Sequence, residues 1–367
     1  MTERERLQMV LRGETPDRVP WFADLGHWFR AESGGQWDLF KINNCNEDIA
    51  ALHREVKAGW YIEVGSLHEE SYGNGVIREK EIIGDRAIEK FITPIGEISM
   101  ERRWNPQSYS WDIIKRIVEN INDLEILLYA VERKIFLPKY ENWNEIERIG
   151  GDLGLGFPSI GYTGLGSLMS YYMGIENSIY AIYENPEIIG NYIKSWNKKQ
   201  LELAGLYSKS PAPHFILTDN LSGDVQSPDI FKEFSFDHYK AIAECFHEKN
   251  KTVSAHLDGR LYGIIGLVAE AGIDVADACT PRPTGDLTPV EIRKQAGENI
   301  ILMGGICPSM WLPSTGEKEF ISHVREWLDL RKINNRLVQS AGDQVPPGTE
   351  LNRIKLVYNI VEEYGRY

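Results

Sequence analysis

Short apolar segments typical of strands alternate along most of the chain with longer segments whose apolar residues recur at helical spacing. The strands are expected at residues 21–24, 61–64, 153–158, 215–220, 252–257, 274–279, 300–307 and 337–343. Helical spacing is found between them, for example in 47–59, 143–150, 261–271, 288–296 and 317–332. Repeated strand–helix units predict a parallel sheet, and their number favours one (β/α)₈ TIM barrel over residues 1–367. An open parallel sheet is the alternative.

Residues 72–104 interrupt this alternation. Turn signals at Gly73-Asn74-Gly75 and Pro94-Ile95-Gly96 flank the segment 87–93, in which apolar and polar residues alternate. The pattern predicts a small β-meander near the N-terminus. At about thirty residues it is too short for a separate domain, so it is expected to be an excursion from the barrel.

Composition narrows the function classes. The chain has 367 residues, a formal net charge of −14 and 42% hydrophobic residues. An acidic chain without basic clusters is a poor nucleic-acid binder. It starts with a charged helix rather than a secretory signal, and no apolar run is long enough to span a membrane. The four cysteines form no CxxC pair, which is typical of a reducing cytoplasm, the expected location.

Polar residues gather at the expected carboxyl ends of the strands, where TIM barrels carry their active sites. They are Asp24, Asp219, His256, Asp258, Cys279, Cys307 and Asp343. His256 and Asp258 should point to one side of their strand because side chains alternate. Imidazole and carboxylate are zinc ligands, so the pair could form half of a catalytic metal site. The alternative is a hydrogen-bonded core histidine followed by an aspartate that caps a helix.

The other candidates also have two interpretations each. Cys307 could supply a thiolate for zinc or fill a buried space, and Asp343 could be a ligand or a turn residue. Asp219 could orient a substrate or act as an acid or base, or it could simply end its strand. Trp21 and Trp28 could line an apolar pocket or belong to the core. The glycines between 161 and 166 lack the order of a dinucleotide-binding loop.

Four motifs carry a resemblance to the uroporphyrinogen decarboxylase superfamily. They are Thr15-Pro16-Asp17-Arg18-Val19-Pro20, Thr93-Pro94-Ile95-Gly96-Glu97, Ser227-Pro228-Asp229-Ile230-Phe231 leading into His256-x-Asp258-Gly259, and Gly304-Gly305-Ile306-Cys307-Pro308. The resemblance follows almost the whole chain in order and implies a single (β/α)₈ barrel. One branch of the superfamily decarboxylates a polyanionic tetrapyrrole. The other comprises zinc methyltransferases that move a methyl group between a small substrate and a corrinoid protein.

The methyltransferases that this chain resembles hold zinc with a His-x-Cys pair and a later Cys. His256 matches the histidine, Asp258 stands where the first cysteine would be, and Asp343 falls near the second. The resemblance therefore implies zinc on His256 and Asp258, completed by Cys307 or Asp343, with harder carboxylate ligands in place of thiolates.

Charge favours the methyltransferase branch. A polycarboxylate substrate needs an arginine cluster to bind its acid groups. The resemblance to the decarboxylases places the first arginine of that cluster at the position that Asp24 occupies in this chain. The expected reaction is metal-assisted transfer of a methyl group from a small methylated substrate to a corrinoid held by a separate protein. Asp219, Trp21, Asp24 and Trp28 are expected around the substrate. The alternatives are a decarboxylase of a small acid or tetrapyrrole-like substrate, using Arg30, Arg260 or Arg282, and a non-catalytic ligand-binding relative.

Overall fold

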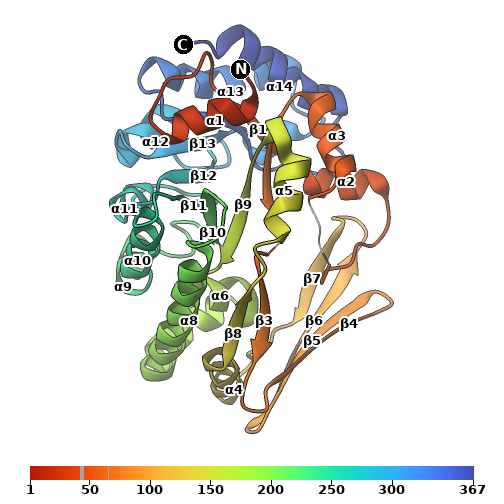
Figure 1. Ribbon diagram of the computed structural model, residues 1–367, viewed down its shortest axis with the longest axis vertical. Helices are drawn as coiled ribbons and strands as arrows, with labels where there is room; N and C mark the ends of the chain where they lie inside the picture. The colour runs from red at the N-terminus through yellow and green to blue at the C-terminus, as the bar shows by residue number, and fades with distance from the viewer. Residues whose placement is uncertain (42–44, 65) are drawn as a thin grey trace.

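A computed structural model describes residues 1–41, 45–64 and 66–367 and shows a closed barrel of eight parallel strands (Figure 1). Around the barrel the strands follow the order β1-β14-β13-β12-β11-β10-β9-β2. Their bounds are β1 Trp21–Asp24, β2 Gly59–Val64, β9 Gly154–Gly161, β10 His214–Leu221, β11 Thr252–Leu257, β12 Val275–Cys279, β13 Ile301–Gly305 and β14 Leu337–Gln344. All eight predicted strands are confirmed, and closure of the sheet decides for the barrel against an open sheet.

Helices cover the outside of the barrel. They are α1 Glu3–Leu11, α2 Gly26–Ser33, α3 Glu47–Val56, α5 Asn142–Gly150, α6 Gly164–Ser167, α7 Ile175–Glu184, α8 Pro186–Tyr207, α9 Pro228–Phe234, α10 Phe236–His247, α11 Ile265–Glu270, α12 Pro289–Ala296, α13 Glu317–Leu328 and α14 Leu351–Tyr364. Helix α9 begins after Ser227, whose side chain caps it by accepting a hydrogen bond from the Ile230 amide at 3.3 Å. In the described part of the chain, no helix has the length and apolarity needed to cross a membrane.

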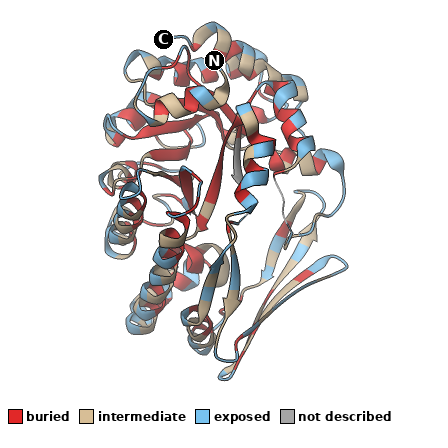
Figure 2. Ribbon diagram, viewed as in Figure 1, coloured by how far each residue is buried: buried red, intermediate tan, exposed pale blue. Residues whose placement is uncertain are grey.

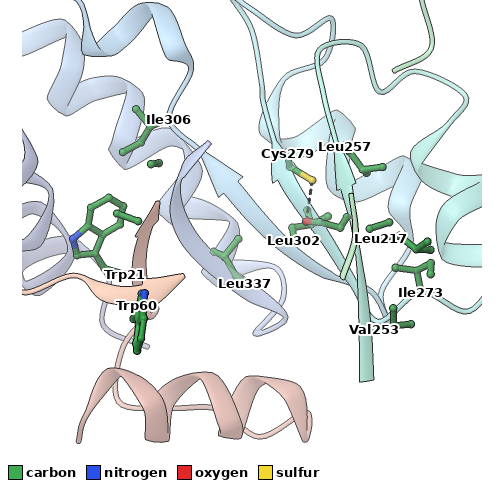
Figure 3. Close-up of a cluster of buried hydrophobic side chains, with 14 of the residues drawn as sticks. Trp21, Trp60, Leu217, Val253, Leu257, Ile273, Cys279, Leu302, Ile306 and Leu337 are labelled. Atoms are coloured by element: carbon green, nitrogen blue, oxygen red, sulfur yellow. Dashed lines mark hydrogen bonds between the residues drawn. The ribbon is translucent and has the colours of Figure 1, made fainter. Parts of the chain in front are cut away.

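The strands separate two layers of apolar side chains. Inside the barrel lies a small cluster that includes Phe22, Phe157, Ile216, Val275 and Val338. Outside, a larger cluster fills the space between strands and helices, and Figure 3 shows part of it. Figure 2 shows the described barrel strands largely buried, with exposed residues on the outer faces of the helices and on the strands of the excursion. Side-chain alternation along each strand thus decides whether a residue faces the inner or the outer layer.

The excursion is larger than the sequence predicts. Four antiparallel strands form one sheet, β4 Ile77–Ile83, β5 Arg86–Thr93, β6 Gly96–Asn105 and β7 Ser110–Lys115, while β3 His68–Tyr72 pairs with β8 Lys134–Pro138. Helix α4 Ile121–Glu132 contacts β5 and β6 on one side and α8 on the other. In Figure 1 the excursion extends away from the barrel beside α8. The excursion extends beyond the predicted residues 72–104 because it also includes α4 and β8. The helical pattern of α4 is like that of the barrel helices, and β8 pairs with a strand about sixty residues earlier.

Candidate active site

The inward-facing residues of neighbouring strands meet at the carboxyl end of the barrel. Ile216 lies in the inner cluster, so Thr218 and Asn220 face inward too, and both line a cavity there. On β11 the Ser254 side chain lies 3.1 Å from His214 inside the barrel, which also directs His256 inward. Ser254 and His256 therefore share the inward face of β11, while Asp258 follows the end of the strand.

His256 is paired with a buried aspartate from the next strand. Its Nδ1 lies 2.8 Å from Oδ2 of Asp277, the residue opposite it in the β11–β12 register. The His256 side chain is 14% exposed and that of Asp277 is fully buried. Burial raises the pKa of Asp277 well above its ordinary value. A hydrogen bond at Nδ1 fixes the orientation of the ring and leaves Nε2 to face the cavity.

Two further carboxylates lie close to this pair. Oδ1 of Asp343 is 3.7 Å from Nε2 of His256, so both ring nitrogens face carboxylate oxygens. Burial raises the pKa of Asp258; His256 opposes the rise and Asp343 adds to it. Asp343 reaches this position after Gly342, whose φ is +85° and where a Cβ would come within 2.1 Å of the Ile306 carbonyl oxygen. Only glycine fits such a backbone conformation without strain.

The cavity in front of His256 has a volume of about 690 Å³. Aromatic side chains form much of its wall, namely Phe157, Trp37, Tyr162 and Tyr171. Asp24 and Asp343 line it as well, while Arg30 is the one arginine among its described lining residues. Burial lowers the pKa of Arg30, and nearby Asp24 opposes this effect. The cavity therefore combines apolar ring surfaces with an excess of carboxylates.

Asp219 is placed away from this cavity, on the outer side of β10. It accepts hydrogen bonds from the Thr163 amide at 2.7 Å, the Thr163 hydroxyl at 2.8 Å and the Tyr239 hydroxyl at 3.0 Å. The packing is close, since a Cβ at Gly166 would come within 2.2 Å of its Oδ1. Burial raises its pKa to about 6. The prediction that Asp219 contacts the substrate is therefore wrong. Its carboxylate instead connects the loop after β9 to strand β10 through hydrogen bonds.

Trp21 and Trp28 are also absent from the described cavity wall. Trp21 is fully buried and Trp28 is 7% exposed, and both belong to the outer apolar layer. Figure 3 shows Trp21 in that layer, and the Trp28 ring nitrogen donates to the Thr349 carbonyl at 2.8 Å. Trp21 stands one position before inward-facing Phe22, so its side chain turns outward. The expected aromatic wall is supplied by other rings, with Trp37 and Tyr162 among them.

The comparisons with known proteins agree with the barrel. A family model for uroporphyrinogen decarboxylase (URO-D) matches residues 145–364, more than half of the chain. The chain belongs to the uroporphyrinogen decarboxylase family. No curated protein sequence matches it.

The structure of this chain is similar to that of a methyltransferase from Methanosarcina mazei. The TM-score is 0.65, the sequence identity is 15%, and the match covers 99% of each chain. An endo-1,4-beta-mannanase from Rhizomucor miehei has a TM-score of 0.43 at 10% identity, covering 94% of this chain and 95% of that one. At such identities the first match shows a shared fold, and the second carries no argument.

The zinc expected for this family member does not fit the residues as they are arranged. The Cys307 thiol is buried in the outer layer and donates to the Pro281 carbonyl at 2.8 Å, and its amide is bonded to His323 at 3.1 Å. Burial raises the thiol's pKa, which disfavours the thiolate that zinc needs. Within residues 1–41, 45–64 and 66–367 no group of three His, Cys, Asp or Glu side chains is arranged to hold a metal ion.

Sequence reasoning missed Asp277 and most of the cavity wall. The signal for Asp277 was present: Val275 is apolar and faces inward, so the residue two positions later shares its side of β12. Trp37, Tyr162 and Tyr171 lie outside the barrel strands. No pattern in the sequence alone shows which of these residues return to the barrel mouth.

Proposed function

We propose that this family member is a methyltransferase, with the methyl-bearing group of a small substrate bound beside His256. The supporting observation is the His256–Asp277 pair, which presents a single ring nitrogen to an aromatic-walled cavity. Such a pair can hold and release a proton at a defined position, because Asp277 fixes the ring from behind. The methyltransferase from Methanosarcina mazei supports the choice only through its shared fold.

In the proposed step His256 acts as the general acid. The bond between the methyl carbon and a heteroatom of the substrate breaks, and its electron pair stays on the heteroatom. That atom takes a proton from Nε2 of His256 and leaves as a neutral alcohol, phenol or thiol. The methyl group passes to a nucleophilic acceptor. Asp277 and Asp343 face the two ring nitrogens, and the hydrogen bond to Asp277 holds the ring so that Nε2 is directed at the substrate.

The acceptor in this proposal is a corrinoid carried by a separate protein that docks over the barrel mouth. Its support is the resemblance of the chain to corrinoid-dependent methyltransferases. When bound, a reduced corrinoid supplies a strong nucleophile for methyl groups. The residues of this chain then bind the substrate, orient its heteroatom and provide the proton.

Decarboxylation of a tetrapyrrole is the second candidate because of the family match. The charges of the cavity oppose it. Asp24 and Asp343 would repel a polycarboxylate, and Arg30 alone cannot neutralise several acid groups. A substrate that is neutral or cationic suits these charges better, and the aromatic rings can pack against it.

Methyl transfer to free cob(I)alamin tests the proposal. The purified protein is offered methyl ethers, thioethers and methylated amines, and formation of methylcobalamin is followed by absorbance. We expect transfer from at least one ether or thioether, and no heat of binding when uroporphyrin is titrated into the protein. Tight uroporphyrin binding without methyl transfer from any donor would overturn the proposal in favour of decarboxylation.

A further inference from the structure

A second cavity of about 470 Å³ lies between the barrel and the excursion. One side is formed by the end of β9 and by α8, and the other by β3, β4 and β8. It shares Ser159, Gly161, Tyr162 and Tyr171 with the reaction cavity. The ring centroids of Tyr162 and Tyr171 are 4.8 Å apart and their hydroxyls are hydrogen-bonded at 3.1 Å, so this tyrosine pair lies where the two cavities adjoin.

The second cavity contains charges that the proposed reaction does not use. Glu70 bonds to Arg78 and to Lys134, the latter at 3.1 Å, and Arg78 also bonds to Glu89 at 2.6 Å. The side chains of Glu70, Arg78 and Lys134 are 28%, 21% and 14% exposed. Burial alone would raise the pKa of Glu70, but Lys134, His68 and Arg78 hold it well below its ordinary value. Removing charged side chains from water costs free energy. A charged network that takes no part in the proposed reaction therefore calls for another function.

Lys134 stands out in this network because its ammonium group, although paired with Glu70, also lies beside the aromatic rings of the cavity. Burial lowers the pKa of its ammonium group, and nearby Arg78 reinforces this although Glu70 opposes it. Its Nζ lies 5.1 Å from the centroid of the Trp196 ring and 5.8 Å from that of Phe136. An ammonium has three donors. The group therefore faces a chamber with rings at its sides and capacity for an acceptor.

We infer that the second cavity binds a small aromatic anion, with its ring among Phe136, Tyr172 and Trp196 and its acid group on Lys134. The rings supply apolar surface and edge contacts. An anionic oxygen accepts a charge-assisted hydrogen bond from Lys134, and among its described lining residues the cavity has three cations, Arg78, Lys134 and Lys199, against one carboxylate, Glu70. This site does not depend on the reaction proposed for the neighbouring cavity.

The backbone around the tyrosine pair supports a binding role. Tyr171 and Tyr172 belong to one turn of π-helix, η2 Leu168–Tyr172, a rare conformation that is frequent at functional sites. Arg116, which follows β7 of the excursion, holds this turn by donating to the carbonyls of Ser170 at 3.1 Å and Tyr171 at 2.9 Å. The excursion therefore both closes the second cavity and fixes the wall that it shares with the reaction cavity.

Calorimetric titration with benzoate, phenylacetate and 3-phenylpropionate tests this site, with the matching amides as uncharged controls. We expect at least one acid to bind, and its amide to bind about tenfold more weakly or worse, because the amide lacks the charge that Lys134 recognises. Lys134→Met should weaken acid binding by a similar factor. Lys139→Met is the matched control, since Lys139 directly follows β8, the strand that Lys134 begins, but pairs with Glu69 outside the cavity.

His256→Ala separates this inference from the proposed reaction, since it should leave the binding of the acid unchanged. Equal affinity for acid and amide in the wild type would overturn the inference even if Lys134→Met failed to fold. So would the absence of binding for all three acids at millimolar concentration. Loss of binding in His256→Ala would place the ligand in the reaction cavity instead.

Discussion

Asp343 and Asp219 both stand near the ends of barrel strands, and they lie on opposite sides of the sheet. Asp343 faces His256 across 3.7 Å in the lined cavity of the barrel mouth. Asp219 is enclosed in the outer layer, where three donors from Thr163 and Tyr239 surround its carboxylate. The chemistry of a carboxylate at a strand end therefore says little about its role until the direction of its side chain is known.

The same contrast extends to the other polar candidates. His256 and Asp277 face inward, where one ring nitrogen remains directed at the cavity. Cys307 faces outward, and its thiol and amide are both held by hydrogen bonds inside the protein. Inward residues can meet a ligand, whereas outward residues hold strands to helices and loops. Changes on the two sides should accordingly affect different measurements, activity on one side and stability on the other.

Replacing His256 should have the largest effect on activity. We expect His256→Ala to lower the rate of methyl transfer about 10²–10⁴-fold, the usual contribution of a positioned general acid. Rates are compared per folded molecule, because the substitution also removes a hydrogen-bond partner of the fully buried Asp277 and should lower thermal stability. The control is His247→Ala, which removes a half-exposed histidine bonded to Asp274 outside the cavity. A rate of methyl transfer unaffected by His256→Ala would contradict the role of the inward-facing His256 in the reaction.

Replacing Asp219 should affect stability instead. Asp219→Ala leaves three buried donors without their acceptor, and we expect the free energy of unfolding to fall by about 3–5 kcal/mol. Urea unfolding measures this loss. The rate per folded molecule should stay within about twofold of wild type, since Asp219 does not line the cavity. Exposed Asp224→Ala serves as the control. A stable but inactive Asp219→Ala would contradict the assignment to the outer layer.

The titration of Asp219 gives a related but smaller signal. Burial raises its pKa from an ordinary value of 3.8 to about 6, so between these values the folded state binds more protons than the unfolded state. Its contribution to stability is therefore present below pH 4 and is lost as the pH rises through 6, by at most about 3 kcal/mol. Comparing urea unfolding of wild type and Asp219→Asn from pH 4 to 7 should show a steeper fall in the wild type, since other buried carboxyl groups such as Asp277 titrate in both proteins.

The barrel was predictable from the sequence because short apolar runs alternate with helical patterns along most of the chain, and the excursion after β2 interrupts this signal without hiding it. The excursion was only partly predictable, since β3 and β8 pair across about sixty residues and neither reveals its partner. Within the site, His256, Asp24 and Asp343 could be placed near the mouth by their position at strand ends.

The direction of the other candidates could not be read as easily. For Asp219 it depends on the inward phase of β10, which Ile216 sets, and for Asp343 on a local shift of register between β1 and β14 next to Gly342. Trp21 and Trp28 were expected at the cavity because they are aromatic and near a strand end. Between the strands and the helices these rings bury more of their apolar surface than they would at the barrel mouth. Which of the two positions a ring occupies depends on the packing of the whole outer layer.

Replacing Cys307 should have the smallest effect and tests the outer side most directly. Cys307→Ala removes one buried sulfur and its hydrogen bond to Pro281, so we expect a loss of about 1 kcal/mol in stability and no change in activity. Because the thiol faces away from His256, zinc measured by elemental analysis should be the same, and below one equivalent, in wild type, Cys307→Ala and His256→Ala. One equivalent in the wild type that disappears in either variant would show that these side chains rearrange around a metal. Loss of the metal in Cys307→Ala would show that Cys307 belongs with the inner polar residues, which contradicts its assignment to the outer layer. Loss of the metal in His256→Ala alone would leave that assignment intact.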